Sequence, residues 1–518
     1  MVGPLAFLVW KALGEGHPEE WWEQARALDV FDVLGRLLLL ASATTLWALL
    51  LGVSLAWLAV RSDVPGRQVL RWLAPLPLTI PPYIGAIVYQ ALLSPRGTVN
   101  RWIASALGVP LEHARVFDVY GVIGAAFVLG LFTYPYVFLL VSGALERSSP
   151  ALEEAGRTAG LTAGQVFRRV TLPLMRPALL AAALIVFLYG WADFGVVSLL
   201  RVRTLTTLIY DYVQGTMDWA LPAALSVVLA GITLTVLLVQ MRALGRRAFT
   251  QITSAARPWR PVALGPWRWP AALWAGGVLS LGLAIPLLTL GVRASGLGLR
   301  PLLALLSTEA GPVVNSLWTA SAGATLALGL AVAAAWLETR RGQGRRITTV
   351  FQIGYAVPGT VLGLGMVGFF NAALPWVYAS PLMLVAGYVA LYVTPACQAA
   401  RAALAQLHGS LEEAASTLGR SQWWIFCRIT LPLAAPGLVS GWMLVFMLSM
   451  RELAATVIMR PPGFDTLAVR LWLYTVDVGP EARASALAIL LVALLAVPSL
   501  LLLRRWARRD PTLSDAVT

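Results

Sequence analysis

The sequence predicts an all-α, polytopic membrane protein built from two tandem repeats of six helices each. Of its 518 residues, 58% are hydrophobic and only 12% are charged, which is about half the charged fraction of an average soluble domain. Apolar runs long enough to cross a bilayer recur along the chain. In addition, a polar stretch of 26 residues occurs twice, 259 residues apart.

Eleven apolar runs reach the length of about 20 residues that is needed to cross about 30 Å of hydrocarbon. They lie near 33–60, 70–93, 120–143, 178–199 and 220–243, and then near 269–292, 315–338, 347–371, 380–403, 437–458 and 484–506. The opening MVGPLAFLVW is too short to span and resembles the end of the run at 269–292. We therefore expect that the first helix of repeat one is truncated, which would complete a plan of six plus six helices.

The distribution of positive charge predicts the orientation. Loops on alternate sides carry 25 and 13 of the 39 Lys and Arg residues, and Arg451 lies inside a span. The more positive side is expected to be cytoplasmic, and it holds both copies of the repeated stretch and the C-terminus. The net charge of +14 does not indicate nucleic-acid binding, because the charges are divided among short loops.

The duplication extends well beyond the polar stretch. AWLAVR (56–61) matches AWLETR (335–340), and FLYGWADFGVVSLLR (187–201) matches FMLSMRELAATVIMR (446–460). Such a repeat predicts two bundles related by a pseudo-two-fold axis around one pathway. The expected boundaries are a first repeat over 1–243, a cytoplasmic linker over 244–268 and a second repeat over 269–518.

Each copy of the polar stretch, at 149–177 and 408–436, is predicted to fold as two short helices joined by a turn. LEEAGRTAGLTAGQVFRRVTLPLMRP in the first copy and LEEAASTLGRSQWWIFCRITLPLAAP in the second are identical at 13 of 26 positions. Gly160 and Gly419 suit a left-handed turn at the end of the first short helix. Pro173 and Pro432 are expected to end the second one.

Capping residues support the same helices. In copy one, Ser149 is placed to cap the first short helix, and Thr162 and Gln165 can form a capping box for the second. In copy two, Ser410 and Glu413 can form a capping box for the first short helix.

The pattern E-A-x(4)-G followed by L-P resembles the EAA loop of the permeases of binding-protein-dependent ABC importers. In that family the short helix docks in a groove of a cytoplasmic ATPase and carries its movement to the membrane helices. The resemblance implies the type I ABC importer permease fold and, with two loops, an ABC ATPase homodimer as partner. The residues implied in ATPase coupling are Glu153, Glu154, Ala155, Gly160 and Pro173 in copy one, and Glu412, Glu413, Ala414, Gly419 and Pro432 in copy two. The alternative is a solvated hairpin that only prevents fraying of the helices.

The chain is expected to be a transport subunit and not an enzyme. A phosphate-binding loop needs Gly-Lys-[Ser/Thr], whereas the only lysine, Lys11, lies in VWKALG. We therefore expect that this chain binds no cofactor and that a separate ATPase uses the ATP and Mg. Motifs of an embedded hydrolase, HExxH or GxSxG, are missing from the sequence.

Two further segments, ADFGVVSLLRVRTLTTLIYDYV (192–213) and RELAATVIMRPPGFDTLAVRLW (451–472), resemble the two halves of fused ferric-iron permeases. The resemblance implies import of ferric iron by alternating access through a multi-pass protein of the bacterial inner membrane. It also implies delivery by a periplasmic or lipid-anchored ferric-iron-binding protein. Import of thiamine, a polyamine or another small solute by the same architecture stays open, as does a secondary transporter.

Four residues within the predicted spans are candidates for the translocation pathway: Tyr189, Asp193, Arg451 and Glu452. Asp193 and Glu452 occupy matched positions, and charges inside a membrane usually face a cavity or a partner. A hard ferric ion would favour carboxylate and phenolate oxygens.

The alternative for these carboxylates is structural, with Asp193 paired to Arg201 and Glu452 to Arg460. No metal site is assigned from histidine, because His17, His113 and His408 are scattered without the spacing of metal ligands.

Overall fold

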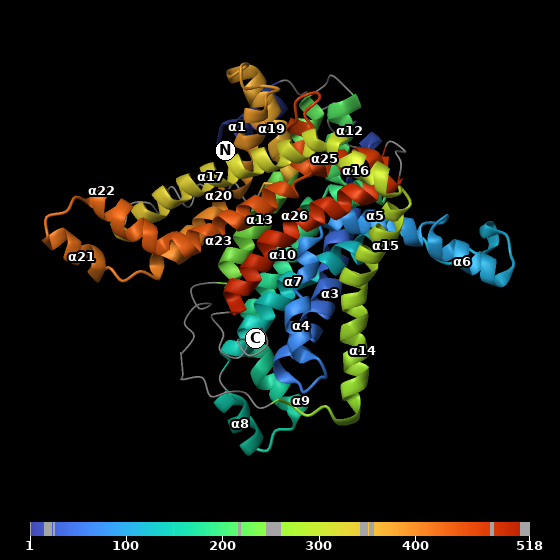
Figure 1. Cartoon of the computed structure of the whole chain (residues 1–518), viewed down its shortest axis with the longest axis horizontal. Coiled ribbons are helices and arrows are strands. Elements are labelled where there is room, and N and C mark those ends of the chain that lie inside the picture. The colour runs from blue at the N-terminus through green and yellow to red at the C-terminus, as the bar shows by residue number, and fades with distance from the viewer. Residues whose placement is uncertain are drawn as a thin grey trace. The chain divides into compact units, whose positions relative to one another are not determined.

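The computed structural model shows a chain built of helices (Figure 1). It describes residues 2–14, 23, 26–148, 150–215, 219–244, 261–341, 351, 357–476 and 481–507. Within those residues, extended pairing is limited to one parallel bridge between Ser62 and Val262. The prediction of an all-α fold is therefore confirmed.

The chain forms two compact units, and each combines segments from both halves of the sequence. Unit 1 comprises Met1–Trp22, Leu208–Leu234 and Leu297–Thr518, and unit 2 comprises Glu23–Thr207 and Thr235–Gly296. Packing defines these units, whereas sequence repetition defines the boundary expected at 244–268. That boundary stays a prediction.

The helices have the following bounds. Those within unit 2 are α3 (Val30–Arg61), α4 (Arg67–Leu73), η1 (Leu76–Thr79), α5 (Pro82–Leu93), α6 (Thr98–Leu107), η2 (Leu111–His113), α7 (Val122–Arg147), α8 (Pro150–Thr158), α9 (Ala163–Val166), η3 (Phe167–Thr171), α10 (Leu172–Ala192), α11 (Gly195–Leu199), η5 (Gly265–Trp267), α14 (Arg268–Leu279), η6 (Ser280–Ala284) and α15 (Ile285–Ser295). Those within unit 1 are α1 (Val2–Gly14), α16 (Leu299–Thr308), α17 (Ala310–Arg341), α19 (Gly359–Ala373), α20 (Pro381–Ala405), α21 (Ser410–Thr417), α22 (Gln422–Ile425), η7 (Phe426–Thr430), α23 (Leu431–Met450), α24 (Ala454–Met459), α25 (Leu467–Val476) and α26 (Glu481–Ala507). Two helices cross the division: α12 (Leu205–Gly215) and α13 (Ala220–Leu244).

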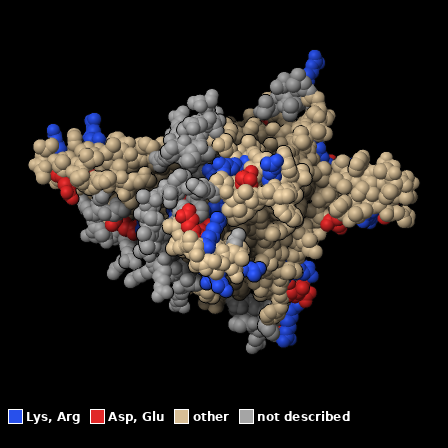
Figure 2. Space-filling view, turned by 90° about the horizontal axis from the view of Figure 1, so that it is seen from below, with Lys and Arg blue, Asp and Glu red and all other residues tan. Residues whose placement is uncertain are grey.

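Nine helices among the described residues are long and apolar enough to cross a membrane. Figure 2 shows wide areas of one face without Lys, Arg, Asp or Glu, as expected for a surface in contact with lipid. A further candidate is a bent pair, Arg67–Thr79 and Pro82–Leu107, whose axes differ by 92°. The run predicted to span at 70–93 therefore contains a sharp bend, and whether the pair crosses the membrane as one span stays a prediction. Pro81 and Pro82 explain the break, because proline excludes the preceding residue from helical geometry.

Two other predicted spans stop earlier than expected. The runs at 178–199 and 437–458 contain α10 and α23, which end at Ala192 and Met450, and a short second helix follows each break. Average hydropathy does not detect these interruptions, because each places few polar residues in an apolar window. The run at 347–371 lies partly outside the described residues, and α19 is its described part.

Small residues allow the main helix pairs to pack closely. In unit 2, α3 packs along α7, and a Cβ added at Gly52 would lie 2.5 Å from the Cβ of Val137. In unit 1, α17 packs along α20, and a Cβ at Gly323 would lie 2.9 Å from the Cβ of Tyr388. Close approach at small residues is the usual way in which membrane helices associate.

Helix α1, from the start of the chain, packs on α19 of the second half within unit 1 (Figure 1). Leu8 and Ala12 of α1 are buried in this contact region. Phe7 of α1 fills the space above Gly368, where a Cβ would lie 2.1 Å from the Phe7 ring.

Helix α15, from the start of the second half, packs on α5 of the first half within unit 2. Leu290 and Ala294 of α15 are buried, and the Tyr89 hydroxyl of α5 donates to the Leu281 carbonyl at 2.7 Å. Each half of the sequence therefore contributes helices to the unit built mainly from the other half.

Candidate functional site

Both copies of the repeated stretch fold as a helix–turn–helix. Loop one (residues 150–171) contains α8 and α9, and loop two (residues 409–430) contains α21 and α22. In Figure 1, α8 and α9 lie at one end of unit 2, and α21 and α22 lie at one end of unit 1. The prediction of two short helices in each copy is confirmed.

The turn between the short helices depends on glycine. Gly160 has φ +83° and Gly419 has φ +74°, in the left-handed region that residues with a Cβ rarely adopt. The backbone N–H of the following residue reaches back into the helix in both loops, from Leu161 to Gly156 at 3.1 Å and from Arg420 to Ala415 at 3.2 Å. The left-handed turn predicted at both glycines is confirmed.

The capping box predicted in loop one is also confirmed. Thr162 N–H donates to Gln165 Oε1 at 2.9 Å, and Gln165 N–H donates to Thr162 Oγ1 at 3.4 Å. This exchange supplies acceptors for two of the N–H groups that a helix start leaves without partners. Ser149, predicted to cap the first short helix, lies outside the described residues.

The capping box predicted in loop two is wrong. Gly409 already precedes the helix in a helical conformation, so Ser410 lies inside the first turn and makes no side-chain cap. The N–H groups of Glu412 and Glu413 instead bond to the Gly409 carbonyl, at 3.0 Å each. A serine cap does occur at the next helix, where Trp424 N–H donates to Ser421 Oγ at 3.3 Å.

The second short helix does not end at the proline as predicted. In loop one, α9 continues through the π-helical turn η3 into α10, and Pro173 is at the start of α10. Loop two does the same through η7, with Pro432 at the start of α23. A π-helical turn has a wider hydrogen-bond spacing than an α-helical turn, and it accommodates proline, which has no backbone N–H.

Glu153 and Glu412 anchor the two loops in the same way. Thr171 Oγ1 donates to Glu153 Oε1 at 2.8 Å, and Thr430 Oγ1 donates to Glu412 Oε1 at 2.7 Å. Sequence reasoning did not select either threonine, although each directly precedes the L-P of its copy. The bond spans 18 residues, so local patterns could not have identified it.

In unit 2 the anchor includes a buried arginine. Arg61, at the end of α3, is 4% exposed, and its NH2 lies 3.7 Å from Glu153 Oε1. The same guanidinium donates to the Leu145 carbonyl at 2.9 Å and to the Ser148 hydroxyl. The carboxylate of loop one is thus connected to the ends of both α3 and α7.

The neighbouring acidic residues face outward. Glu154 and Ala155 of loop one are exposed, as are Glu413 and Ala414 of loop two. The loops therefore present a carboxylate and a small side chain at matched positions on their outer surfaces. This arrangement suits contact with another protein.

Asp193 caps a short helix. It follows α10, and its Oδ2 accepts from the N–H groups of Val196 and Val197 at 2.9 and 3.2 Å. The backbone carbonyl of Asp193 accepts from Thr206 Oγ1 at 2.7 Å. These bonds satisfy the first turn of α11.

Glu452 has the matched role in unit 1. Its Oε1 accepts from Ala455 N–H at 3.0 Å, at the start of α24. Its Oε2 accepts from the Tyr392 hydroxyl. A Cβ added at Gly359 would lie 2.9 Å from Oε1, which shows how closely the surrounding chain encloses this carboxylate.

The pairings considered as alternatives are not those formed. Arg460 pairs with Asp465, and the Arg201 guanidinium lies 4.9 Å from the ring centroid of Tyr120. The hydrogen bonds that Asp193 and Glu452 accept from backbone N–H groups are a structural role for both carboxylates that does not depend on these arginines.

The other two pathway candidates lie beside these carboxylates in the chain. The Tyr189 ring lies 6.3 Å from that of Tyr136, centroid to centroid. Arg451 follows the last residue of α23 and directly precedes Glu452. Whether Tyr189, Asp193, Arg451 and Glu452 line a pathway stays a prediction.

A charged cluster surrounds the start of α25 in unit 1. Arg470 contacts Glu309 Oε2 at 3.1 Å and Asp465 Oδ2 at 3.4 Å, and Tyr474 donates to Glu309 Oε1 at 2.6 Å. Burial lowers the pKa of Arg470, but the hydrogen bond and negative charge of Glu309 outweigh it and raise that pKa above its ordinary value. Because Arg470 already pairs with Glu309 and Asp465, these carboxylates are not available to bind another cation.

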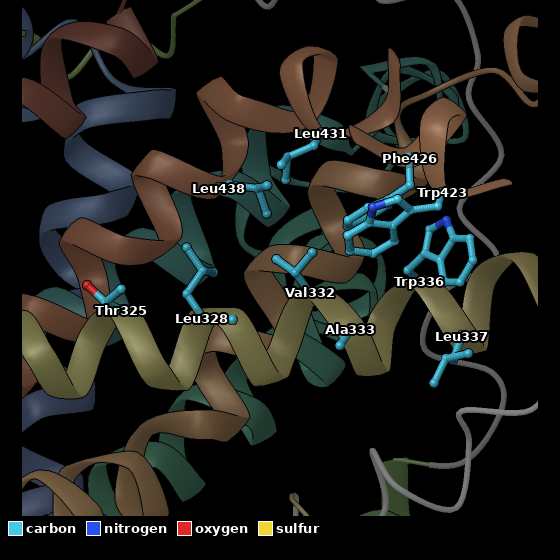
Figure 3. A pocket seen from close by; sticks show the side chains of 11 residues that line it. Thr325, Leu328, Val332, Ala333, Trp336, Leu337, Trp423, Phe426, Leu431 and Leu438 are labelled. Carbon is cyan, nitrogen blue, oxygen red and sulfur yellow. The ribbon is translucent and has the colours of Figure 1, made fainter. Parts of the chain in front are cut away.

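Unit 1 also contains an apolar groove of about 570 Å³ between α17 and α23 (Figure 3). Trp336 and Val332 of α17 face Trp423, Phe426 and Leu438 across it. Its lining is aromatic and aliphatic apart from the Thr325 hydroxyl, so the groove lacks the oxygen ligands that a hard cation prefers. Among the described residues, no group of three or more His, Cys, Asp or Glu side chains is placed to hold a metal ion.

The fold and its two matched loops define the class of protein. The sequence pattern of the family described as binding-protein-dependent transport system inner membrane component matches residues 48–250 and 325–509. These two segments make up most of the chain, so the chain belongs to this family. Its two matches correspond to the two repeats, which makes it a fused permease.

Individual relatives are consistent with this assignment. The chain is 27% identical over 488 residues to an Fe(3+)-transport system permease protein of Haemophilus influenzae, covering 92% of this chain and 90% of that protein. It is 27% identical over 408 residues to a ferric transport system permease protein of Actinobacillus pleuropneumoniae, covering 74% of this chain and 58% of that protein. A sulfate transport system permease protein of Escherichia coli is 29% identical over 197 residues, 38% of this chain.

Proposed function

We propose that this chain is the transmembrane permease of an ATP-driven importer that carries ferric iron into the cell. The observation that carries the proposal is likeness over almost the whole chain to a permease named for Fe(3+) transport. Sulfate and 2-aminoethylphosphonate permeases match only 38% and 29% of the chain. The segments 192–213 and 451–472, which resemble ferric-iron permeases, support the same substrate.

An ABC ATPase homodimer is the partner that would supply energy. The exposed faces of loops one and two, with Glu154 and Glu413 at matched positions, would dock in its two grooves. ATP and Mg would be bound by that partner. The charge distribution supports a cytoplasmic location for both loops and for the C-terminus.

Transport would proceed by alternating access. A periplasmic or lipid-anchored ferric-iron-binding protein would deliver its cargo on the outer side. Closure of the ATPase dimer would move the loops and, through them, α10 and α23. Hydrolysis would reset the inward-facing state. Asp193 and Glu452 would act in this cycle mainly by fixing the breaks after α10 and α23.

The experiment that tests this function is uptake of radiolabelled ferric iron by iron-starved cells. The permease is deleted, then restored, and finally restored together with a partner ATPase unable to hydrolyse ATP. We expect loss of uptake on deletion, recovery on restoration, and no recovery with the inactive ATPase. Unchanged iron uptake on deletion would overturn the substrate, and thiamine, polyamines and sulfate would be tested next. Uptake that survives the inactive ATPase but stops with a proton ionophore would indicate a secondary transporter.

A further inference from the structure

The strongest unassigned feature is the hydrogen bond that joins each short helix to the membrane helix after it. In loop one the Thr171 hydroxyl is buried at the last position of η3, and it donates to Glu153 in the first turn of α8. In loop two, Thr430 is fully buried and donates to Glu412 in the first turn of α21. The two bonds differ by 0.1 Å in length and connect equivalent positions.

Along the chain, α8 is connected to α10 through a turn that contains a left-handed glycine, and α8 also packs on α9 and η3. Residues 161–162 after Gly160 are not helical, and a single backbone connection of this kind allows hinge motion. The hydrogen bond from Thr171 to Glu153 adds a directed polar connection to this packing and restricts that motion. Because the acceptor is a carboxylate, this bond is of the stronger, charge-assisted kind.

The two adjacent glutamates in each loop therefore have different roles. Glu154 and Glu413 are exposed and available to a partner. Glu153 and Glu412 are partly buried and bind inward. In unit 2, the buried Arg61 further fixes the inward carboxylate to the ends of α3 and α7.

We infer that the hydrogen bonds Glu153–Thr171 and Glu412–Thr430 are rigid links. They make α8 move with α10, and α21 move with α23, as one body. Glu153 and Glu412 are positioning residues that act through α10 and α23. This inference rests on the proposed function for its consequence in transport. The rigidity itself can be measured independently of any substrate.

The first test measures rigidity by pulsed spin-label spectroscopy on the full-length chain. Cys397 and Cys427 are replaced by serine, and labels are placed at Arg157→Cys on α8 and Leu180→Cys on α10, both of which are exposed. We expect a narrow distance distribution that broadens in Thr171→Val and is restored in Thr171→Ser. An unchanged width in Thr171→Val would overturn the inference, whatever the protein transports.

The second test measures coupling in proteoliposomes that contain the permease, its ATPase and its binding protein. In Thr171→Val with Thr430→Val, the ATPase should still co-purify, whereas ferric iron imported per ATP hydrolysed should fall by roughly tenfold or more, as expected for loss of one hydrogen bond to a charged group in each loop. Thr171→Ser with Thr430→Ser should restore the ratio. Wild-type coupling in the valine variant would overturn the inference, whereas failure of the unmodified complex to import iron would overturn only the proposed substrate.

A matched control uses two other buried threonines of unit 2. The hydroxyls of Thr45 and Thr133 donate only within their own helices, to Ala41 and Leu129 at 2.6 Å each. Thr45→Val with Thr133→Val removes the same number of buried hydroxyls and should leave both the distance distribution and the transport ratio unchanged. A loss equal to that of Thr171→Val with Thr430→Val would show that buried hydroxyls in general, and not the links, support coupling.

Discussion

At the scale of single residues, adjacent glutamates with the same chemistry have different surroundings. Glu153 accepts a hydrogen bond from a threonine 18 residues later, whereas Glu154 is exposed. Asp193 and Glu452 lie near the middle of apolar sequence, yet each accepts from backbone N–H groups at a helix start. The position of an acidic residue in a membrane segment therefore does not identify it as a ligand.

Substitutions can separate capping from metal binding at these carboxylates. Asp193→Asn with Glu452→Gln keeps an acceptor oxygen at each position but removes the charge, so we expect iron uptake within about twofold of wild type, because Asn caps a helix about as well as Asp and Glu452→Gln keeps an oxygen for Ala455 N–H. Asp193→Ala with Glu452→Ala removes the caps and should cost about 1 kcal/mol of stability at each site, with lower protein levels in the membrane. Uptake and membrane levels are measured in parallel. Loss of uptake in the Asn and Gln variant at normal protein levels would show that the charges are needed for transport.

Local sequence predicted part of the site and could not predict the rest. Gly160, Gly419 and the Thr162–Gln165 box act within a few residues of chain, so their roles followed from residue type and spacing. The capping box predicted at Ser410 and Glu413 does not form, because the helical conformation of Gly409 moves the start of the helix by one residue. The partners of Glu153 and Glu452 lie 18 and 60 residues away, and only the folded chain brings them together.

At the scale of elements, most helices follow from hydropathy, while their breaks follow from residues that hydropathy averages out. The bend of 92° near Pro81 divides a run that reads as one apolar segment. The same holds at the ends of α10 and α23, where the next helix begins within a few residues. The structure therefore has shorter straight segments than its apolar runs suggest.

The packing of α1 on α19 gives a prediction at this scale. Gly368→Leu would drive its side chain into the Phe7 ring, and overpacking of this kind costs about 1–3 kcal/mol. We expect a lower thermal unfolding midpoint for the detergent-solubilised protein. Adding Phe7→Ala should recover part of the loss, because it empties the space that leucine needs. No recovery in the double variant would contradict the contact between these two positions.

At the scale of the whole molecule, the sequence halves and the packed units divide the chain differently. Helix α15 comes from the second half but packs on α5 in unit 2, and Trp274 of α14 donates to the Ser54 hydroxyl of α3 at 3.0 Å. The fragment 1–244 would lack these contacts, whereas the fragment 1–296 would retain them.

Expression of the two fragments tests this division. We expect the fragment 1–296, expressed alone, to have a longer half-life in membranes than the fragment 1–244. Pulse-chase labelling of tagged fragments measures both, and each fragment contains α1 without α19, so that loss is matched. Co-expression of 245–518 with 1–244 should lengthen the half-life of the shorter fragment by returning α14 and α15 to it. Equal half-lives for the two fragments expressed alone would show that α14 and α15 contribute little to unit 2.

The contact between α1 and α19 can form only late in biosynthesis, after α19 has been translated. The partner of α1 begins roughly 345 residues after α1 ends, which at translation rates of about 5–20 residues per second is a delay of roughly 20 to 70 s. During that interval α1, whose 13 described residues form a helix of about 20 Å, has no α19 to cover its apolar face. The ribosome therefore delivers α1 long before its place in the fold exists, so the insertion machinery or the lipid interface must hold it until α19 arrives.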